Sequence, residues 1–460
     1  MNKIKLIDSH AHLNFPELKS DLENVLQRAS EGGVEKIICV GTTVEDSKDA
    51  LELADKYPFI FASSGVHPHE ASSITNKTYR ELKKLASHKK VVAVGEVGLD
   101  YHYKHSPIEK QKETFASFID LAREVNLPLI VHTREAEEDT MEILRNRNAS
   151  DAGGVIHCFS GSLEMAHKCM DMGFYISIPG IVTFKNAKNI HAVVKEIPIE
   201  KMLIETDSPY LAPVPFRGKT NEPAYVKHVA EKIAEIKNLS LEDVARITCL
   251  NSLSLFGLEG NAAAPEISYR IRDSLYLNIT NRCTNSCTFC AKNVDYTVKG
   301  HYLKIPDEPT AEEIIDSIGD VHQYKEVVFC GYGEPLLRLD IIKEVGGWLK
   351  ERGVNVRINT DGLANRVYKR NILPELSGII DSISVSLNAD SAERYNKICR
   401  PPFPDAYREV KKFLYEAKTY IPHVTASVVG LPNLDVEKCR KVAESELGVE
   451  FRLRTFNDVG

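Results

Sequence analysis

Along residues 1–258, short apolar runs alternate with polar stretches that have the composition of helices. Eight of these runs are rich in β-branched residues and predict strands, at 5–8, 36–41, 60–65, 91–96, 129–132, 155–158, 174–178 and 202–206. Alternating strands and helices are typical of βα units around a parallel sheet. Eight strands close a (β/α)8 TIM barrel, although a doubly wound open sheet would show the same alternation. The strand count therefore favours a barrel.

The pattern is interrupted after residue 256. Residues 257–265 contain two glycines, three consecutive alanines and a proline, which is typical of a linker. We place a first domain at 1–258, a linker at 259–269 and a second domain at 270–460. Six more strands are predicted there, at 274–280, 326–330, 355–359, 382–387, 423–429 and 450–454. Six strands are too few for a second full barrel.

Composition adds little to this picture of two α/β domains. The chain has 460 residues, 43% of them hydrophobic, and a formal net charge of -7, which gives no electrostatic signal for unspecific duplex binding. No apolar run is long enough to span a membrane, and the first residues lack the features of a signal peptide. Apart from one cluster, the ten cysteines are scattered, as expected in a reducing compartment. We therefore expect a cytoplasmic protein without membrane contact, and the pattern predicts no oligomeric state.

Metal-type side chains recur at the ends of the predicted strands of the first domain. In an α/β barrel these positions share one face, so distant residues converge there. His10 and His12 are two residues apart, which puts both rings on one side of a strand. Glu96 offers two oxygens and can bridge two ions. The expected ligands of two divalent ions are His10, His12, Glu96, His132, His157 and Asp207.

Two ions about 3.5–4 Å apart suit displacement at phosphorus. Asp207 could both contact a metal and accept the proton of the attacking water, with Glu96 as the other catalytic carboxylate. Mixed nitrogen and oxygen ligands leave zinc, manganese and magnesium open.

Six segments of the first domain resemble the successive signatures of TatD-type metal-dependent deoxyribonucleases. They are DSHAHL at 8–13, GVHPH at 65–69, GEVGLD at 95–100, VHTR at 131–134, HCFSG at 157–161 and ETDSPY at 205–210. The resemblance implies a TIM barrel of the amidohydrolase type that hydrolyses phosphodiesters, usually as a 3′ to 5′ exonuclease on DNA. It implies the same six metal ligands, with Asp207 as the base. It also implies that His67 either supports the metal ligands or faces a substrate phosphate, and that Arg217 and Lys219 could hold that phosphate.

A different reaction stays open, because related barrels with this ligand array hydrolyse amides or acyl esters. In that alternative the second domain would act as a redox regulator of the hydrolase. The cations Arg217 and Lys219 favour a nucleic acid substrate.

The second domain contains Cys283, Cys287 and Cys290, spaced by three and then two residues, directly after its first predicted strand. Three thiolates cannot fill a four-iron cluster, so one iron would keep an open position. Zinc prefers four protein ligands, and no further cysteine or histidine pair follows at a usable spacing. The spacing therefore favours a 4Fe-4S cluster.

This cysteine motif is similar to that of radical S-adenosylmethionine (SAM) enzymes. Further likeness lies in GYGEP at 331–335, NTDG at 359–362 and SVSLN at 384–388, although Tyr332 separates two glycines that are commonly adjacent. The resemblance implies a partial (β/α)6 barrel, SAM bound to the open iron, and an external reductant for the cluster. The implied SAM contacts are Gly331, Gly333, Glu334, Asn359, Ser386 and Asn388. The whole chain resembles TatD-linked radical SAM proteins, and the pattern names no substrate for the second domain.

Overall fold

The computed structural model describes residues 4–258, 265–293, 296–432 and 434–454. The chain divides into two compact units, Met1–Gly260 and Asn261–Gly460. Residues 259–264 of the predicted linker lie outside the described residues, and the strand β9 (Ser268–Ile271) begins within its last part.

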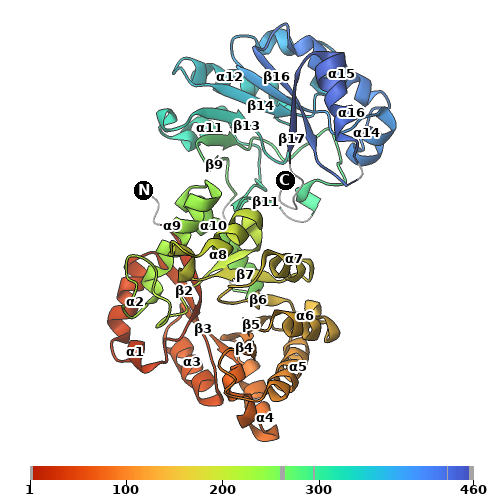
Figure 1. The fold of residues 1–460 in the computed structure, drawn as a ribbon. Coiled ribbons are helices and arrows are strands. Elements are labelled where there is room, and N and C mark those ends of the chain that lie inside the picture. Colours follow the sequence, from red (N-terminus) through yellow and green to blue (C-terminus); the bar gives the residue numbers. More distant parts are fainter. Residues whose placement is uncertain (1–3, 259–264, 294–295, 433, 455–460) are drawn as a thin grey trace. The chain divides into compact units, whose positions relative to one another are not determined.

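The first unit is an eight-stranded parallel sheet in the order β1 to β8 (Figure 1). The strands are β1 (Leu6–Ala11), β2 (Val34–Cys39), β3 (Ile60–Ser64), β4 (Val91–Asp100), β5 (Leu129–Arg134), β6 (Gly154–Ile156), β7 (Tyr175–Ile178) and β8 (Met202–Ile204). A parallel bridge between Ala11 and Ser208 brings the last strand back to the first. The predicted (β/α)8 barrel is confirmed.

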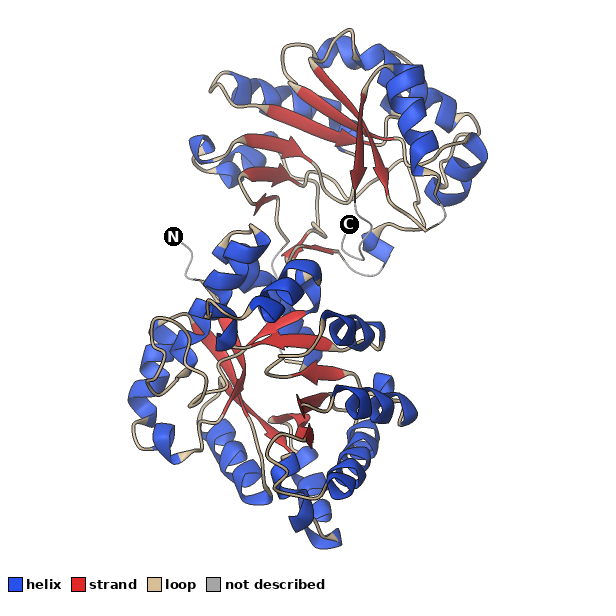
Figure 2. Ribbon diagram, in the orientation of Figure 1, coloured by secondary structure: helices blue, strands red, loops and turns tan. Residues whose placement is uncertain are grey.

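Helices surround this barrel (Figure 2). They are α1 (Pro16–Lys19), α2 (Leu22–Glu31), α3 (Val44–Lys56), α4 (Asn76–Ala86), α5 (Ile108–Val125), α6 (Glu137–Asn146), α7 (Leu163–Asp171), α8 (Lys188–Glu196), α9 (Val226–Lys237) and α10 (Leu241–Leu255). Side chains alternate along each strand, so Ile37 and Val131 pack with the helices while Ile38 and Ile130 belong to a second apolar cluster. Phe256 joins that second cluster, which fills the barrel interior.

The second unit is a seven-stranded sheet in the order β17-β16-β15-β14-β13-β10-β9. Six strands are parallel, at β10 (Ser274–Leu277), β13 (Glu326–Phe329), β14 (Val356–Thr360), β15 (Ser382–Ser386), β16 (His423–Val429) and β17 (Glu450–Arg454). They stand at the six predicted places, in the strand order of a partial (β/α)6 barrel. The antiparallel edge strand β9 was not predicted.

The helices of this unit are α11 (Ala311–Ile318), α12 (Leu339–Lys350), α13 (Ala364–Tyr368), α14 (Ala392–Cys399), α15 (Ala406–Ala417) and α16 (Val436–Lys441). A short hairpin of β11 (Thr297–Val298) and β12 (His301–Tyr302) follows the cysteine motif. In the part of the chain that the structure describes, no helix is both long and apolar enough to cross a membrane.

Candidate functional site

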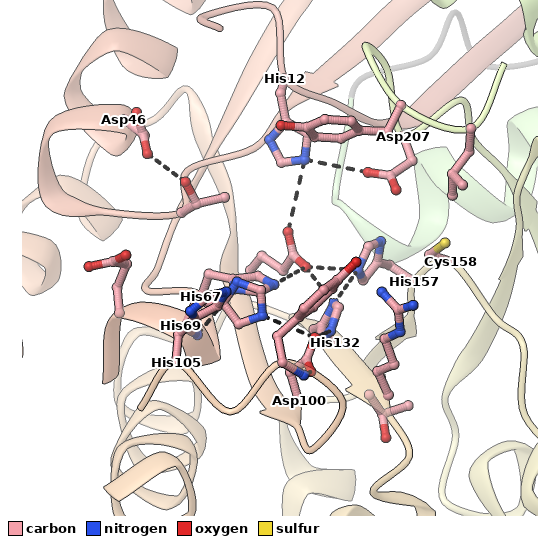
Figure 3. Close-up of a pocket in the computed structure, with 18 of the residues that line it drawn as sticks. His12, Asp46, His67, His69, Asp100, His105, His132, His157, Cys158 and Asp207 are labelled. Carbon is pink, nitrogen blue, oxygen red and sulfur yellow. Dashed lines mark hydrogen bonds and ion pairs between the residues drawn. The ribbon is translucent and has the colours of Figure 1, made fainter. Parts of the chain in front are cut away.

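The metal-type side chains of the first unit meet at the carboxyl ends of its strands, where Figure 3 shows His12, Asp207, His132 and His157 pointing toward a common centre. Each comes from a different strand or from the loop that follows it. The six residues brought together are His10 in β1, His12 after it, Glu96 in β4, His132 in β5, His157 after β6 and Asp207 after β8. Five of them have side chains that are at most 13% exposed, and that of His132 is 16% exposed.

The two oxygens of Glu96 face two separate groups of donors. On one side, Glu96 Oε2 lies 3.4 Å from His10 Nε2 and 4.0 Å from His12 Nε2. On the other side, Glu96 Oε1 lies 2.8 Å from His132 Nδ1 and 2.8 Å from His157 Nε2. Asp207 belongs to the first group, with Oδ1 3.4 Å from His12 Nε2. One buried carboxylate is therefore shared between two nitrogen-rich positions.

The spacing of the first donor group fits a divalent cation. Donor atoms about 2.1 Å from one tetrahedral ion lie about 3.4 Å from each other. The His10 and His12 Nε2 atoms are 3.3 Å apart, which matches that value. A buried group of imidazoles and carboxylates is costly without a cation that it can bind. The second group is tighter, with Glu96 Oε1 2.8 Å from both imidazoles and 3.1 Å between His132 Nδ1 and His157 Nε2, so these side chains would have to separate slightly around an ion. The types of donor suit two ions, one at each oxygen of Glu96.

The imidazoles shift the ionisation of this site. Burial alone would raise the pKa of Glu96, but the charge of the neighbouring His157 and hydrogen bonds from His10 and His132 outweigh it and hold the pKa well below its ordinary value. Burial lowers the pKa of His67 to about 3, so this ring is neutral and its Nε2 lies 3.4 Å from Glu96 Oε1. His67 thus stands beside the ligand group, and its contact with a substrate phosphate stays a prediction.

Two carboxylates that had no assigned role support the histidines from behind. Asp100, at the end of β4, lies with Oδ2 3.2 Å from His132 Nε2 and 3.1 Å from His69 Nε2. Glu205 lies with Oε1 3.6 Å from His157 Nδ1 and accepts a hydrogen bond from the Cys158 N–H. A carboxylate on the far nitrogen fixes the tautomer of a metal-binding histidine and raises its basicity. Both residues lie within segments that carry the family resemblance, Asp100 at the end of GEVGLD and Glu205 at the start of ETDSPY, which was the only available signal.

The ligand group forms the floor of a cavity of about 890 Å³, which His12, Glu96, His132, His157 and Asp207 help to line. Cavities of this size hold small-molecule ligands or part of a larger one. Arg134, at the end of β5, is the one lysine or arginine among the described residues that line it, and its guanidinium lies 4.8 Å from the centre of the Tyr103 ring.

The two cations expected to hold a substrate phosphate lie elsewhere. The Arg217 guanidinium packs over the Phe184 ring at 4.4 Å, and the Lys219 ammonium lies over the Phe216 ring at 5.7 Å. Neither residue lines the cavity as the structure describes it. A role for them at a phosphate stays a prediction, whereas Arg134 supplies a cation inside the cavity.

In the second unit, the cysteine motif forms a loop after β10 that is fixed to the end of α14. The Ser286 and Thr288 N–H groups donate to the carbonyls of Cys399 and Ile398, at 3.1 and 2.8 Å. Cys283, Cys287 and Cys290 are half-buried and free. Burial raises the pKa of Cys283 to about 12. The pKa of Cys287 is also raised, mainly by a hydrogen bond with Cys399 and to a smaller extent by burial. These thiols stay protonated unless a metal displaces their protons, as a cluster would.

The other predicted SAM contacts lie at the carboxyl ends of neighbouring strands. A Cβ on Gly331 would stand 2.1 Å from Asn278 Oδ1, and one on Gly333 would stand 2.1 Å from the Thr280 carbonyl, so close approach to the end of β10 requires both glycines. Glu334 uses its oxygens within the protein, accepting from the Leu336 and Asp361 N–H groups and the Thr360 hydroxyl.

Two of the remaining three residues have side-chain partners in the chain. The Asn359 amide contacts Cys330 Sγ at 3.2 Å, and Asn388 Oδ1 accepts from the Val429 N–H. Ser386 is half-buried at the end of β15. Contact of these side chains with SAM stays a prediction.

Comparison with known proteins separates the two units. Residues 7–257 match the family model of TatD related DNase, which is more than half of the chain, and residues 277–445 match the Radical SAM superfamily. The uncharacterized metal-dependent hydrolase YabD of Bacillus subtilis (strain 168) is 51% identical over 251 residues, which are 55% of this chain and 98% of YabD. The uncharacterized metal-dependent hydrolase YcfH of Escherichia coli (strain K12) is 42% identical over 261 residues, 56% of this chain and 97% of YcfH.

Among solved structures, that of YJJV, a TatD homolog from Escherichia coli K12, superimposes with a TM-score of 0.53 at 31% identity and covers 56% of this chain and 99% of YJJV. These relatives match the part of the chain that carries the shared Glu96 site. The chain therefore belongs to the TatD related DNase family, and it joins this metal-dependent hydrolase domain to a domain of the radical SAM superfamily.

Proposed function

We propose that the first domain hydrolyses phosphodiester bonds at the 3′ end of DNA with two divalent ions, which are zinc, manganese or magnesium. The observation that carries this proposal is Glu96, whose Oε2 and Oε1 atoms face two donor groups at 3.4 Å and 2.8 Å. Two adjacent cations suit an in-line displacement at phosphorus. One cation can activate the attacking water, and the other can stabilise the negative charge that develops on the leaving oxygen.

When bound, the two ions supply a lowered pKa for water and stabilise negative charge on phosphoryl oxygens. In this proposal His10, His12 and Asp207 hold one ion, and His132 and His157 hold the other with Glu96 between them. Asp207 accepts the proton of the attacking water. In the metal-free protein, hydrogen bonding from His12 and the nearby imidazoles outweigh burial and lower the pKa of this carboxyl, so it is ionised at neutral pH. A bound cation in place of the His12 proton would likewise favour the carboxylate. Arg134 pairs with the substrate phosphate in the cavity.

For the second domain we propose a 4Fe-4S cluster held by Cys283, Cys287 and Cys290, with SAM as its co-substrate and a cellular reductant as its electron source. When bound, the cluster and SAM together supply a carbon-centred radical. Both reactions would take place in the cytoplasm, where free thiols persist. The half-buried cysteine loop, fixed to α14, supports the cluster assignment.

The test is an assay of the metal-loaded full chain on a single-stranded oligonucleotide labelled at its 5′ end, beside a p-nitrophenyl acyl ester. We expect a ladder of products shortened from the 3′ end, and loss of that ladder in Glu96→Gln or after chelation. Glu45→Gln, at an exposed position of α3 outside the cavity, serves as the matched control. Ester turnover without shortening of the oligonucleotide would refute the nucleic acid assignment.

A further inference from the structure

Tyr332, the residue between the two glycines of the GYGEP segment, has no role in the contacts described so far. Gly331 and Gly333, on either side of it, lie so close to the end of β10 that a Cβ on either would clash. The Tyr332 side chain is instead 8% exposed and belongs to a small apolar group that is separate from the main core of the sheet. We call its buried members the hairpin core, and they are Tyr269, Ala291, Leu303 and Tyr332.

The hairpin of β11 and β12 is attached to the GYGEP segment through Tyr332. The Tyr332 hydroxyl donates to the Thr297 carbonyl at 2.8 Å, and its ring meets the Tyr296 ring edge to face, with centroids 5.6 Å apart at 78°. Directly after β12, the Leu303 N–H donates to the Tyr296 carbonyl at 2.8 Å. The Leu303 carbonyl in turn accepts from the Asn278 amide at 2.8 Å. The hairpin is therefore bound to the ends of both β10 and β13.

The second strand of the hairpin has a separate attachment. His301, in β12, is 5% exposed, with Nδ1 2.9 Å from Glu266 Oε2 and Nε2 3.0 Å from the Arg270 carbonyl. The Glu266 N–H donates to the Tyr302 carbonyl at 2.9 Å. These contacts fix β12 to β9 and the residues before it, whereas the hydroxyl and ring of Tyr332 act on β11. Loss of the Tyr332 hydroxyl should thus loosen β11 while β12 stays in place.

One of the three expected iron ligands packs against the hairpin core. Cys290 is half-buried, and it lies against this group together with Tyr296 and Val298 of the hairpin. Cys287, by contrast, packs against the main core of the sheet. Tyr332 and β11 therefore cover the Cys290 side of the cysteine loop.

We propose that Tyr332 is a positioning residue for the iron–sulfur cluster, because it fixes β11 as a cover over Cys290 and so limits how often solvent and reagents reach that thiol. A hydrogen bond and an edge-to-face ring contact both make local opening rarer. Solvent exposure of a cluster is one of the factors that set its reduction potential. This inference rests on the cluster assignment of the proposed function and gives a role to a residue that the SAM resemblance leaves without one.

The test measures the reaction of each cysteine with N-ethylmaleimide in the cluster-free full chain, by mass spectrometry of its peptides. Tyr332→Phe removes the hydroxyl and keeps the ring. Labelling of Cys290 should become about fivefold faster, which is the population change expected for the loss of one hydrogen bond. Labelling of Cys283 should not change. Tyr407→Phe is the matched control, since the buried Tyr407 hydroxyl donates to the Ala389 carbonyl at 3.1 Å in the main core, and Cys290 should react there as in the unchanged chain.

Equal labelling of Cys290 in the unchanged chain and in Tyr332→Phe would overturn the proposal. Cys439 is fully buried in the main core and reports on general unfolding. An equal acceleration at Cys283 or Cys439 would show a loosening of the whole unit and would overturn the proposal as well.

A second measurement uses the protein with its cluster rebuilt under anaerobic conditions. Release of iron to the ferrous chelator ferrozine, in the presence of dithionite, should quicken in Tyr332→Phe by the factor found for Cys290. An unchanged rate of release would refute the role at the cluster. If Cys290 responds as expected but no cluster assembles in the unchanged chain, the cover over Cys290 stands and the cluster assignment fails, so the two failures are distinguishable.

Discussion

Asp100→Asn is the change that most directly tests the architecture of the metal site. Asp100 is 1% exposed, and its Oδ2 lies 3.2 Å from His132 Nε2 and 3.1 Å from His69 Nε2. The carboxylate favours a proton on His132 Nε2 and so leaves the Nδ1 lone pair toward Glu96 Oε1, 2.8 Å away. An amide of the same shape accepts either tautomer and no longer raises the basicity of the ring.

The expected cost follows from this contact. Loss of the group behind a metal-binding histidine lowers metal affinity about 10–100-fold, which corresponds to about 1.4–2.7 kcal/mol. Only the ion beside His132 and His157 should weaken. The ion beside His10, His12 and Asp207 has no contact with Asp100 and should keep its affinity.

The assay is a titration of the metal-free protein against a chelating dye, which resolves two affinities. Asp46→Asn is the matched control, since Asp46 lines the same cavity but accepts hydrogen bonds from the hydroxyls of Thr42 and Thr43 rather than from an imidazole. Two unchanged affinities in Asp100→Asn, or an equal loss in Asp46→Asn, would contradict the tautomer explanation.

Two further predictions concern charge. Arg134→Gln removes a charge-assisted hydrogen bond worth about 1.5–3 kcal/mol, so kcat/KM on the oligonucleotide should fall about 10–100-fold; an unchanged value would exclude Arg134 from the phosphate site. Burial raises the pKa of Asp361 from 3.8 to about 6, so the folded protein binds this proton more tightly than the unfolded chain, and stability is lost as the pH rises from 3.8 through 6. Asp361→Asn should therefore raise the free energy of unfolding of the cluster-free protein in urea by about 1–3 kcal/mol at pH 8 and by less at pH 5; a gain independent of pH would contradict this.

The fold was largely readable from the sequence because each buried strand is a short β-branched run between polar stretches. The eight parallel strands of the first unit and the six of the second stand where these runs predict them. The edge strand β9 was missed because Ser268–Ile271 has only four residues and begins in a segment with the composition of a linker. This strand forms by antiparallel pairing with β10, and composition alone does not show which segments pair.

The supporting carboxylates could not be predicted for a different reason. The run predicted to end at Glu96 continues as β4 to Asp100, and the β4–β5 register sets Asp100 beside Arg134 and Gly98 beside His132. Contact between Asp100 and His132 follows from that register, which the sequence does not state. The same applies to Arg134, whose place in the cavity depends on where β5 ends, whereas Arg217 and Lys219 are drawn aside by stacking on Phe184 and Phe216.

The ligands of one ion come from the first strand and from the loop after the last. The Asp207 N–H donates to the His10 carbonyl at 2.9 Å, and the His12 N–H donates to the Ser208 carbonyl at 2.8 Å, so the backbone seam that closes the barrel runs directly beneath this ion. A cation bound here would stabilise the contact between the first and the last strand, because its ligands come together only when the barrel is closed. Metal-depleted protein should therefore fray first where the two ends of the barrel meet, and its amides there should be the earliest to exchange with solvent.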